Sequence, residues 1–223
     1  MVAFRQAWPS MLVGFLSLAP LAALLFGCAG RLDLPWFWAY LGVWAVSAVV
    51  GPLVTDPTLL SERLHPGPGA KDPVFTLLMG PLFVLPFIVA GLDVRFHWSS
   101  VTSATVRALG LAVVATGLAV TMWALAVNRF FSSVIRIQTE RGHRVISSGP
   151  YRWVRHPGYA AAPLVFVGMG YALGSRWEAL AAVPLMLGVL RRTIREDRVL
   201  HDELPGYRDY AAKVRYRLLP GVW

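Results

Sequence analysis

Long stretches without a charged side chain are the feature of this sequence that most restricts its fold. Five runs of 19 to 25 residues contain no Asp, Glu, Lys or Arg: 6–30, 34–55, 74–92, 108–128 and 156–175. A helix needs about 20 apolar residues to cross the roughly 30 Å hydrocarbon core of a bilayer. Each run therefore predicts a membrane helix. A sixth, shorter run at 179–190 is interpreted as the return arm of a hairpin with the run before it.

The composition also indicates that lipid surrounds much of the chain. Apolar residues make up 56% of the sequence and charged residues only 15%, with a mean hydropathy of +0.55. A soluble domain carries about 25% charged residues. We therefore predict an all-α fold: a polytopic membrane helical bundle of about six membrane helices, the last two forming a hairpin, followed by C-terminal helices.

The positive charges are distributed unevenly between the two ends of these helices. Segments 1–7, 56–73, 128–158 and 191–223 hold 17 of the 21 Lys and Arg residues, and the alternate connections hold four. Cytoplasmic loops of membrane proteins are enriched in Lys and Arg. This pattern predicts a multi-pass protein of the cell (inner) membrane with both termini in the cytoplasm. The net charge of +9 is then explained by orientation and by attraction to membrane lipids, and no nucleic-acid partner is expected.

The segment 128–158 interrupts the series of apolar runs. It is rich in Arg, contains Gly142, Gly149 and Pro150, and is long for a connection between packed helices. Aromatic and branched residues are interleaved through it, whereas disordered segments are poor in such residues. We therefore predict a folded, functional loop.

Two polar clusters flank the last predicted hairpin, one from His143 to Tyr159 and one from Arg191 to Asp197. A helical hairpin returns the chain to the side that it left, so both clusters should meet on the cytoplasmic face. Glu196 lies four residues after Arg192 and shares its helix face. The acidic pair at 196–197 can accept hydrogen bonds from hydroxyl or ammonium groups, while the loop offers cations and rings. Such a pocket suits a zwitterionic, nucleotide-like ligand.

These residues carry a family resemblance. The pattern His143-x-Val145-Ile146, Gly149-x-Tyr151, Arg155-His156-Pro157-x-Tyr159, a helical hairpin, then Arg192-Thr193-x-x-Glu196-Asp197 resembles isoprenylcysteine carboxyl methyltransferases and their phospholipid methyltransferase relatives. The resemblance covers roughly 128–220. It divides the chain into N-terminal membrane helices (1–127, two hairpins) and a methyltransferase-like catalytic region (128–223) that includes the 157–191 hairpin.

The resemblance implies an enzyme that binds S-adenosylmethionine in a cytoplasmic pocket and methylates a lipophilic acceptor that enters laterally from the membrane. A prenylcysteine-like carboxylate is the favoured acceptor. Arg192 and Glu196 are the implied catalytic residues. The implied cofactor-binding residues are His143, Arg144, Val145, Ile146, Tyr151, Arg155, His156, Pro157, Gly158, Tyr159 and Glu196. The chain departs from the family pattern at Arg136, where a glutamine is usual, and at Ala161, where a glycine is frequent.

Three other functions remain open from the sequence. The acceptor can instead be a phospholipid amine or another small molecule with a reactive nitrogen or sulfur. A membrane reductase of the sterol-reductase type would bind NADPH, and Arg136, Arg141 and Arg144 could hold its 2′-phosphate. A membrane protein without catalytic activity is the third. No metal-binding motif is present in the sequence, and no obligate protein partner is expected.

Overall fold

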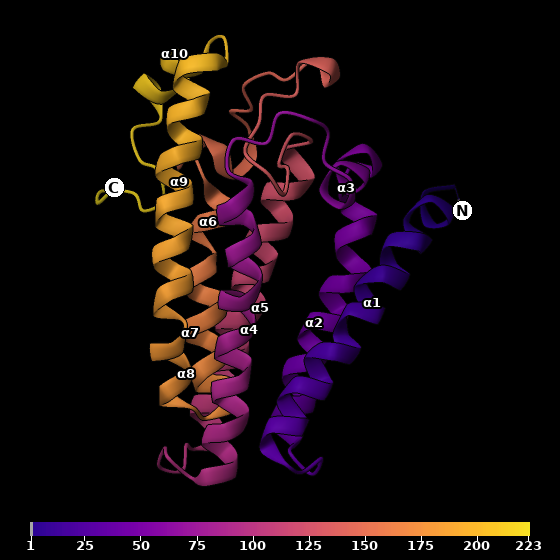
Figure 1. Cartoon of the computed structure of the whole chain (residues 1–223), viewed down its shortest axis with the longest axis vertical. Coiled ribbons are helices and arrows are strands. Elements are labelled where there is room, and N and C mark those ends of the chain that lie inside the picture. The colour runs from indigo at the N-terminus through magenta and orange to yellow at the C-terminus, as the bar shows by residue number, and fades with distance from the viewer. Residues whose placement is uncertain (1) are drawn as a thin grey trace.

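The structure is a computed structural model that describes residues 2–223, with the side chains of 2–6, 73, 74 and 76 left aside. Over this range the chain forms helices and no strand (Figure 1). The helices are α1 (Val2–Ala29), α2 (Pro35–Val54), α3 (Pro57–Leu64), α4 (Pro73–Phe96), α5 (Ala104–Val127), α6 (Pro157–Ala160), α7 (Ala162–Leu173), α8 (Arg176–Ala181), α9 (Val183–Glu203) and α10 (Tyr207–Lys213), with 3₁₀ turns at Thr139–Arg141 and Gly149–Arg152.

Four of these helices are long and apolar enough to cross a membrane. They are Ala7–Ala29, Pro35–Val54, Leu77–Phe96 and Ala104–Val127, and Pro157–Leu173 forms a shorter apolar segment. The prediction of a polytopic helical membrane bundle is therefore confirmed. The last two apolar runs form the expected hairpin, with its turn at Gly174 and Ser175, where Gly174 adopts a φ of +75°.

Both arms of this hairpin are interrupted, which the sequence analysis did not predict. The first arm breaks at Ala161 between α6 and α7, and the second breaks at Ala182 between α8 and α9. Pro163 and Pro184 follow these breaks by two residues. Proline has no N–H to donate to the carbonyl four residues earlier and its ring clashes with that carbonyl. Each proline therefore starts a new helix and redirects the arm.

A short helix, α3, begins the segment 56–73 that follows the second run. Its start has a physical signal in the sequence: Pro57 occupies the first turn, and the Asp56 carboxylate accepts the backbone N–H of Thr58 at 2.8 Å. An acidic N-cap followed by proline favours a helix start. The helix positions Glu62 and Arg63 against the loop 128–158, as described below.

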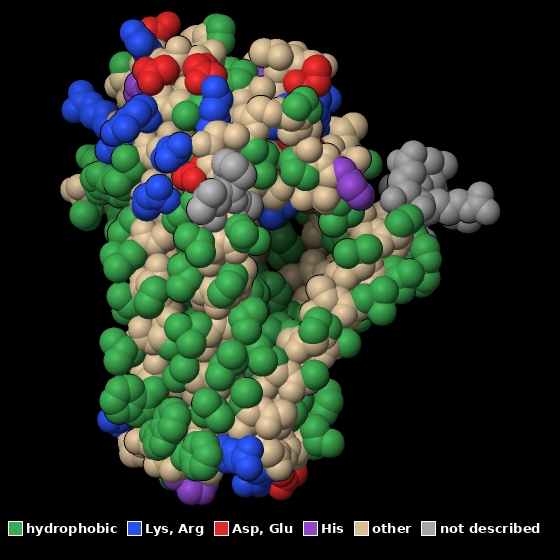
Figure 2. All heavy atoms as spheres, viewed as in Figure 1, with side chains coloured by type: hydrophobic (Ala, Val, Ile, Leu, Met, Phe, Trp, Pro, Cys, Tyr) green, Lys and Arg blue, Asp and Glu red, His purple; other side chains and the backbone are tan. Residues whose placement is uncertain are grey.

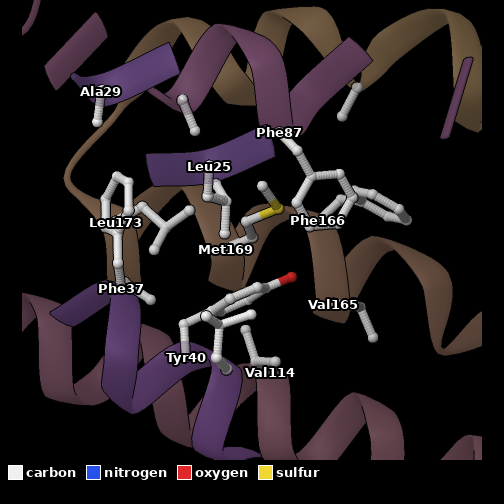
Figure 3. Close-up of a cluster of buried hydrophobic side chains, with 14 of the residues drawn as sticks. Leu25, Ala29, Phe37, Tyr40, Phe87, Val114, Val165, Phe166, Met169 and Leu173 are labelled. Atoms are coloured by element: carbon white, nitrogen blue, oxygen red, sulfur yellow. The ribbon is translucent and has the colours of Figure 1, made fainter. Parts of the chain in front are cut away.

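The hydrophobic core is shared by the N-terminal and C-terminal regions. Figure 3 shows Leu25 of α1, Phe37 and Tyr40 of α2, Phe87 of α4 and Met169 of α7 converging in one cluster, and none of these side chains is more than 1% exposed. The hairpin that carries the polar clusters is therefore anchored on helices from both regions.

Glycines bring α5 and α7 into close contact. A Cβ atom built on Gly110 would lie 2.5 Å from the backbone nitrogen of Ala172, and one built on Gly168 would lie 2.9 Å from the carbonyl of Gly110. Small residues allow membrane helices to approach in this way. This contact fixes the first arm of the hairpin beside α5, and α5 leads directly into the polar loop.

Charged and apolar side chains are separated along the bundle. Figure 2 shows hydrophobic side chains over the middle of the visible face and charged ones at the two ends, mostly at the end that holds α3 and α10. Below this charged end the surface is hollowed between the main bundle and the upper halves of α1 and α2, which lean away from it (Figures 1 and 2). This hollow lies beside the hydrophobic side chains that cover the middle of the visible face.

Candidate active site

Tyr159 connects the two predicted polar clusters. Its hydroxyl donates to the Glu196 carboxylate at 2.6 Å and accepts from Arg192 Nε at 2.7 Å. Arg192 also donates from Nη2 to the Ser133 carbonyl at 2.7 Å. Because α9 rises about 1.5 Å per residue, Arg192 lies about 6 Å nearer the membrane than Glu196. The hydroxyl thus joins an acidic group nearer the charged end of the bundle to a cation nearer its apolar middle.

Glu196 has no Lys or Arg within ion-pair distance in the described part of the chain. His156 is its nearest basic partner, with Nδ1 at 4.0 Å from Oε1, and the Glu196 side chain is 23% exposed. Arg192 reaches it only through the Tyr159 hydroxyl. A largely enclosed carboxylate without a direct Lys or Arg ion pair is suited to bind a positively charged ligand.

Asp197, the next residue, is instead fully engaged within the protein. Arg155 donates to both of its oxygens, at 2.8 and 3.0 Å, and Arg217 Nε donates to Oδ2 at 2.8 Å. His156 Nε2 and the Tyr207 hydroxyl lie 3.2 and 2.9 Å from Oδ1. Burial favours a higher pKa for Asp197, but the hydrogen bonds from His156 and Arg155 outweigh it and hold the pKa well below its ordinary value. Asp197 therefore organises the site and is not free for a ligand.

Arg155 ties this end of the bundle to the C-terminal segment. Its Nη1 donates to the carbonyls of Val214 and Arg215 at 2.9 and 2.7 Å, and its backbone N–H donates to the Tyr216 carbonyl. The Tyr210 hydroxyl donates to the Tyr151 carbonyl at 2.6 Å. The C-terminal segment thus closes over the Arg155-His156-Pro157 turn.

The loop 128–158 is held by buried polar contacts, as its composition predicted. Arg136 donates to both oxygens of Glu62 on α3, at 2.9 and 2.8 Å, and also pairs with Glu140 at 2.6 Å. Gln138 is fully buried and donates to the Phe130 carbonyl, and Arg141 donates to Gln138 and to Thr58. Arg136 and Arg141 are therefore committed to structural contacts, which weakens the case for a 2′-phosphate site.

The polar clusters line a narrow cavity of about 40 Å³. Its walls are formed by Asn128, Phe131, His143, Arg144, Val145, Ile146, Tyr151, Arg155, His156, Glu196, Leu200, Leu204, Tyr207 and Tyr210. A second cavity of about 50 Å³ shares Glu196 and Phe131 among its walls.

The structure brings most of the sequence-predicted site residues to this cavity. Eight line it: His143, Arg144, Val145, Ile146, Tyr151, Arg155, His156 and Glu196. The other four predicted residues do not line the cavity: Pro157, Gly158, Tyr159 and Arg192. Pro157 is buried at the start of α6, and Gly158 packs so closely on Phe131 that a Cβ atom would lie 2.8 Å from the ring.

Six lining residues were not predicted as site residues: Asn128, Phe131, Leu200, Leu204, Tyr207 and Tyr210. Two of them had a detectable signal, because Leu200 and Leu204 follow Glu196 at intervals of four and so share its helix face. Tyr207 and Tyr210 lie in the segment that carries the family resemblance, whereas Asn128 and Phe131 had no specific signal.

His143 is neutral at ordinary pH. Its ring stacks on Phe130 with centroids 4.6 Å apart, and Nδ1 accepts the backbone N–H of Gln138 at 3.3 Å, which leaves Nε2 as the protonated nitrogen. Burial, with help from the charges of Arg141 and Arg136, lowers the pKa of His143 from 6.5 to about 4.

A specific pH dependence follows from this shift. The unfolded chain binds a proton at His143 below about pH 6.5, whereas the folded chain does so only near pH 4, so folding stability is expected to fall as the pH drops through this window. Thermal unfolding in detergent between pH 7 and 4 measures it. His143→Asn, which keeps an acceptor near the Nδ1 position, should flatten the slope, and His65→Asn at an exposed position should not. An unchanged slope in His143→Asn contradicts the assignment.

The comparisons with known proteins agree with this geometry. Residues 105–204 match the phospholipid methyltransferase family, from the first turn of α5 to the end of α9. A search of curated proteins found no match. The matched region contains the loop, the hairpin and most of the cavity lining, and the apolar helices identify an integral membrane protein. The predicted resemblance to integral-membrane methyltransferases is confirmed by this match, which covers 100 of the 223 residues.

Proposed function

We propose that this protein transfers a methyl group from S-adenosylmethionine to a lipophilic acceptor held in the membrane. The family implies a membrane methyltransferase. The observation that carries the choice of cofactor is Glu196, a carboxylate on the cavity wall with no Lys or Arg within ion-pair distance in the described structure. A cationic, nucleotide-like cofactor would supply the missing positive charge.

The cavity residues fit such a cofactor by their chemistry. Glu196 can accept from its ammonium group or stabilise its sulfonium charge, and His143 can donate from Nε2 to a heterocycle or carboxylate. Arg144 adds a cation for the carboxylate. Tyr151, Tyr207 and Tyr210 provide aromatic walls for an adenine ring. Arg155 and His156 line the cavity but act through Asp197, which fixes their position.

S-adenosylmethionine, when bound, supplies an activated methyl group whose carbon–sulfur bond breaks, with its electron pair left on sulfur, as the acceptor forms the new bond. The protein's own contribution is orientation and exclusion of water. Orientation of two reactants can lower a barrier by about 7–11 kcal/mol. Arg192 positions the acceptor from the membrane side of the Tyr159 hydroxyl, and Glu196 holds the opposite side.

The acceptor we favour is a prenylcysteine-like carboxylate. Arg192 is a cation on the membrane side of the site and can bind a carboxylate, which needs no base because it is already deprotonated. Its apolar chain would occupy the hollow below the charged end of the bundle (Figure 2). A phospholipid amine is the second candidate, favoured by the description of the matched family; an amine must lose its proton, and Glu196 or His156 would then serve as the base.

The orientation of the protein is part of this proposal. The described beginning of α1 and the C terminus both lie toward the end of the molecule that carries α3 and α10 (Figure 1). Since that end holds most of the Lys and Arg residues, we place it in the cytoplasm, with the protein in the cell (inner) membrane. The cofactor then comes from the cytoplasm and the acceptor from the bilayer.

Methyl transfer can be tested directly. Membranes containing the protein, incubated with methyl-labelled S-adenosylmethionine, are expected to yield a labelled lipid-soluble product. Mild alkali should release the label if the product is an ester and leave it if the product is a methylated amine. Purified protein should be stabilised against heat by S-adenosylmethionine and not by NADPH. Stabilisation by NADPH alone would show that the reductase alternative is correct.

A further inference from the structure

Arg63 lies outside the family-matched region, and its guanidinium is close enough to Tyr159 and Arg192 for their charges to interact. It lies on α3, and Nη1 donates to the Phe131 carbonyl at 3.2 Å. Its guanidinium carbon sits 5.5 Å from the centre of the Phe131 ring. In the described part of the chain this carbonyl is the only acceptor of a side-chain N–H of Arg63, so most of its five donors remain available.

Arg63 and Arg192 are connected in two ways, through Ser133 and through a pair of neighbouring aromatic rings. Ser133 connects them, because its hydroxyl donates to the Arg63 carbonyl at 3.1 Å and its own carbonyl accepts from Arg192. The rings beneath the two cations also touch: Arg192 lies over Tyr159 at 5.8 Å, and the Tyr159 and Phe131 rings have centroids 5.7 Å apart. The two guanidinium groups therefore border one region next to the Tyr159 hydroxyl.

Arg63 and Arg192 bring two positive charges to this region, since arginine stays protonated in proteins. In the described part of the chain neither guanidinium has a carboxylate within ion-pair distance, although the charges of Glu196 and Asp72 act on Arg192. Burial lowers the pKa of Arg63, which shows that keeping this cation enclosed has a cost. A partly enclosed cation with unused donors is stabilised by an anion that accepts from it.

We propose that Arg63 is a specificity-determining residue that, together with Arg192, binds an oxyanion of the acceptor, and thereby selects acidic over neutral acceptors. This proposal rests on the proposed methyltransferase function and extends it by a residue that the matched region does not contain. The oxyanion is either the carboxylate of a prenylated amino acid or the phosphodiester of a phospholipid headgroup.

Binding of synthetic probes to the purified protein in a neutral detergent tests the proposal without turnover. The carboxylate probe is N-acetyl-S-farnesylcysteine, and its carboxamide is the neutral match. The phosphodiester probe is dioleoylphosphatidylglycerol, and dioleoylglycerol is its neutral match. Arg63→Gln is expected to weaken one acidic probe by about 30-fold, or about 2 kcal/mol, and to change the neutral matches less than threefold. The acidic probe that responds identifies the source of the oxyanion.

Two further variants separate charge from folding. Arg63→Lys keeps the positive charge and should retain most of the preference for the acidic probe. Arg129→Gln removes an exposed cation that lies 4.0 Å from Asp56 and away from both cavities, and it should change nothing. Equal losses for acidic and neutral probes in Arg63→Gln, or no loss for either acidic probe, would overturn the role of Arg63.

Cofactor binding is measured separately by calorimetry with S-adenosylmethionine alone. Arg63→Gln is expected to bind it within about twofold of the parent, because Arg63 does not line the cofactor cavity. If the parent protein binds no S-adenosylmethionine, the proposed function fails whatever the probes show. If it binds the cofactor and Arg63→Gln weakens acidic and neutral probes equally, or weakens neither, only the inference about Arg63 fails.

Discussion

Glu196→Gln is expected to weaken S-adenosylmethionine binding by at least about 30-fold, while leaving the helices folded. Glutamine has nearly the same shape and keeps an oxygen that can accept from the Tyr159 hydroxyl, which now lies 2.6 Å from the carboxylate. It removes the only negative charge on the cavity wall that is not neutralised by an arginine. Loss of one partner in a desolvated charge pair typically costs about 2–5 kcal/mol.

Isothermal calorimetry in detergent measures this loss, and thermal unfolding checks the fold. Glu203→Gln is a matched control on the same helix. Glu203 pairs with Lys71 at 3.0 Å, is 42% exposed and does not line the cofactor cavity, and exposed ion pairs contribute little. His156→Ala should weaken binding as well, because the ring lines the cavity. Parent-like affinity in Glu196→Gln would rule out the proposed cofactor position.

Asp197→Asn is expected to destabilise the end of the bundle that carries α3 and α10 by about 3–5 kcal/mol, because it leaves buried cations without their counter-charge. Asp197 is 2% exposed and accepts hydrogen bonds from both Arg155 and Arg217. Asparagine can accept at one oxygen only, and its amide group faces guanidinium donors. We expect a large fall in the melting temperature and early proteolysis of the segment after α9, which Arg155 holds in place.

Asp202→Asn is the control for this variant, since Asp202 lies on the same helix, is 61% exposed and is 3.9 Å from Arg208. The pH dependence gives an independent check. Because the folded pKa of Asp197 is below its unfolded value of 3.8, its stabilisation is complete above that pH and is lost below it. This window lies below that of His143. A parent-like melting temperature for Asp197→Asn would show that Asp197 is dispensable.

The helices could be predicted because their signal is local. A charge-free run of about 20 residues is long enough to cross the bilayer as a helix, and a helix makes its backbone hydrogen bonds within itself. Each of the runs ending near Gly30, Thr55, Leu92 and Asn128 therefore formed one helix of about the expected length. The breaks at Ala161 and Ala182 were missed because hydropathy does not register the effect of Pro163 and Pro184 on backbone hydrogen bonds.

The site could be predicted in part because one simple topological rule applies. A hairpin returns its chain, so residues before Pro157 and after Leu190 had to be near one another, and Tyr159 does contact Glu196 across 37 positions of sequence. The distinct roles of Glu196 and Asp197 could not be predicted. Both are acidic neighbours in sequence, yet their side chains point about 100° apart around the helix, so one faces the cavity and the other faces Arg155.

The sequence by itself determined the lipid environment of this chain, the approximate bounds of its first four long apolar helices, and the meeting of two polar clusters at one end, because each depends on hydropathy, charge or chain reversal alone. Only the tertiary structure decided which polar groups are neutralised within the protein and which face a cavity. Arg136 pairs with Glu62 across 74 positions, Asp197 with Arg155 across 42, and Arg63 approaches the site from α3. Such pairings depend on how separate helices are placed in space, and no local pattern encodes that placement.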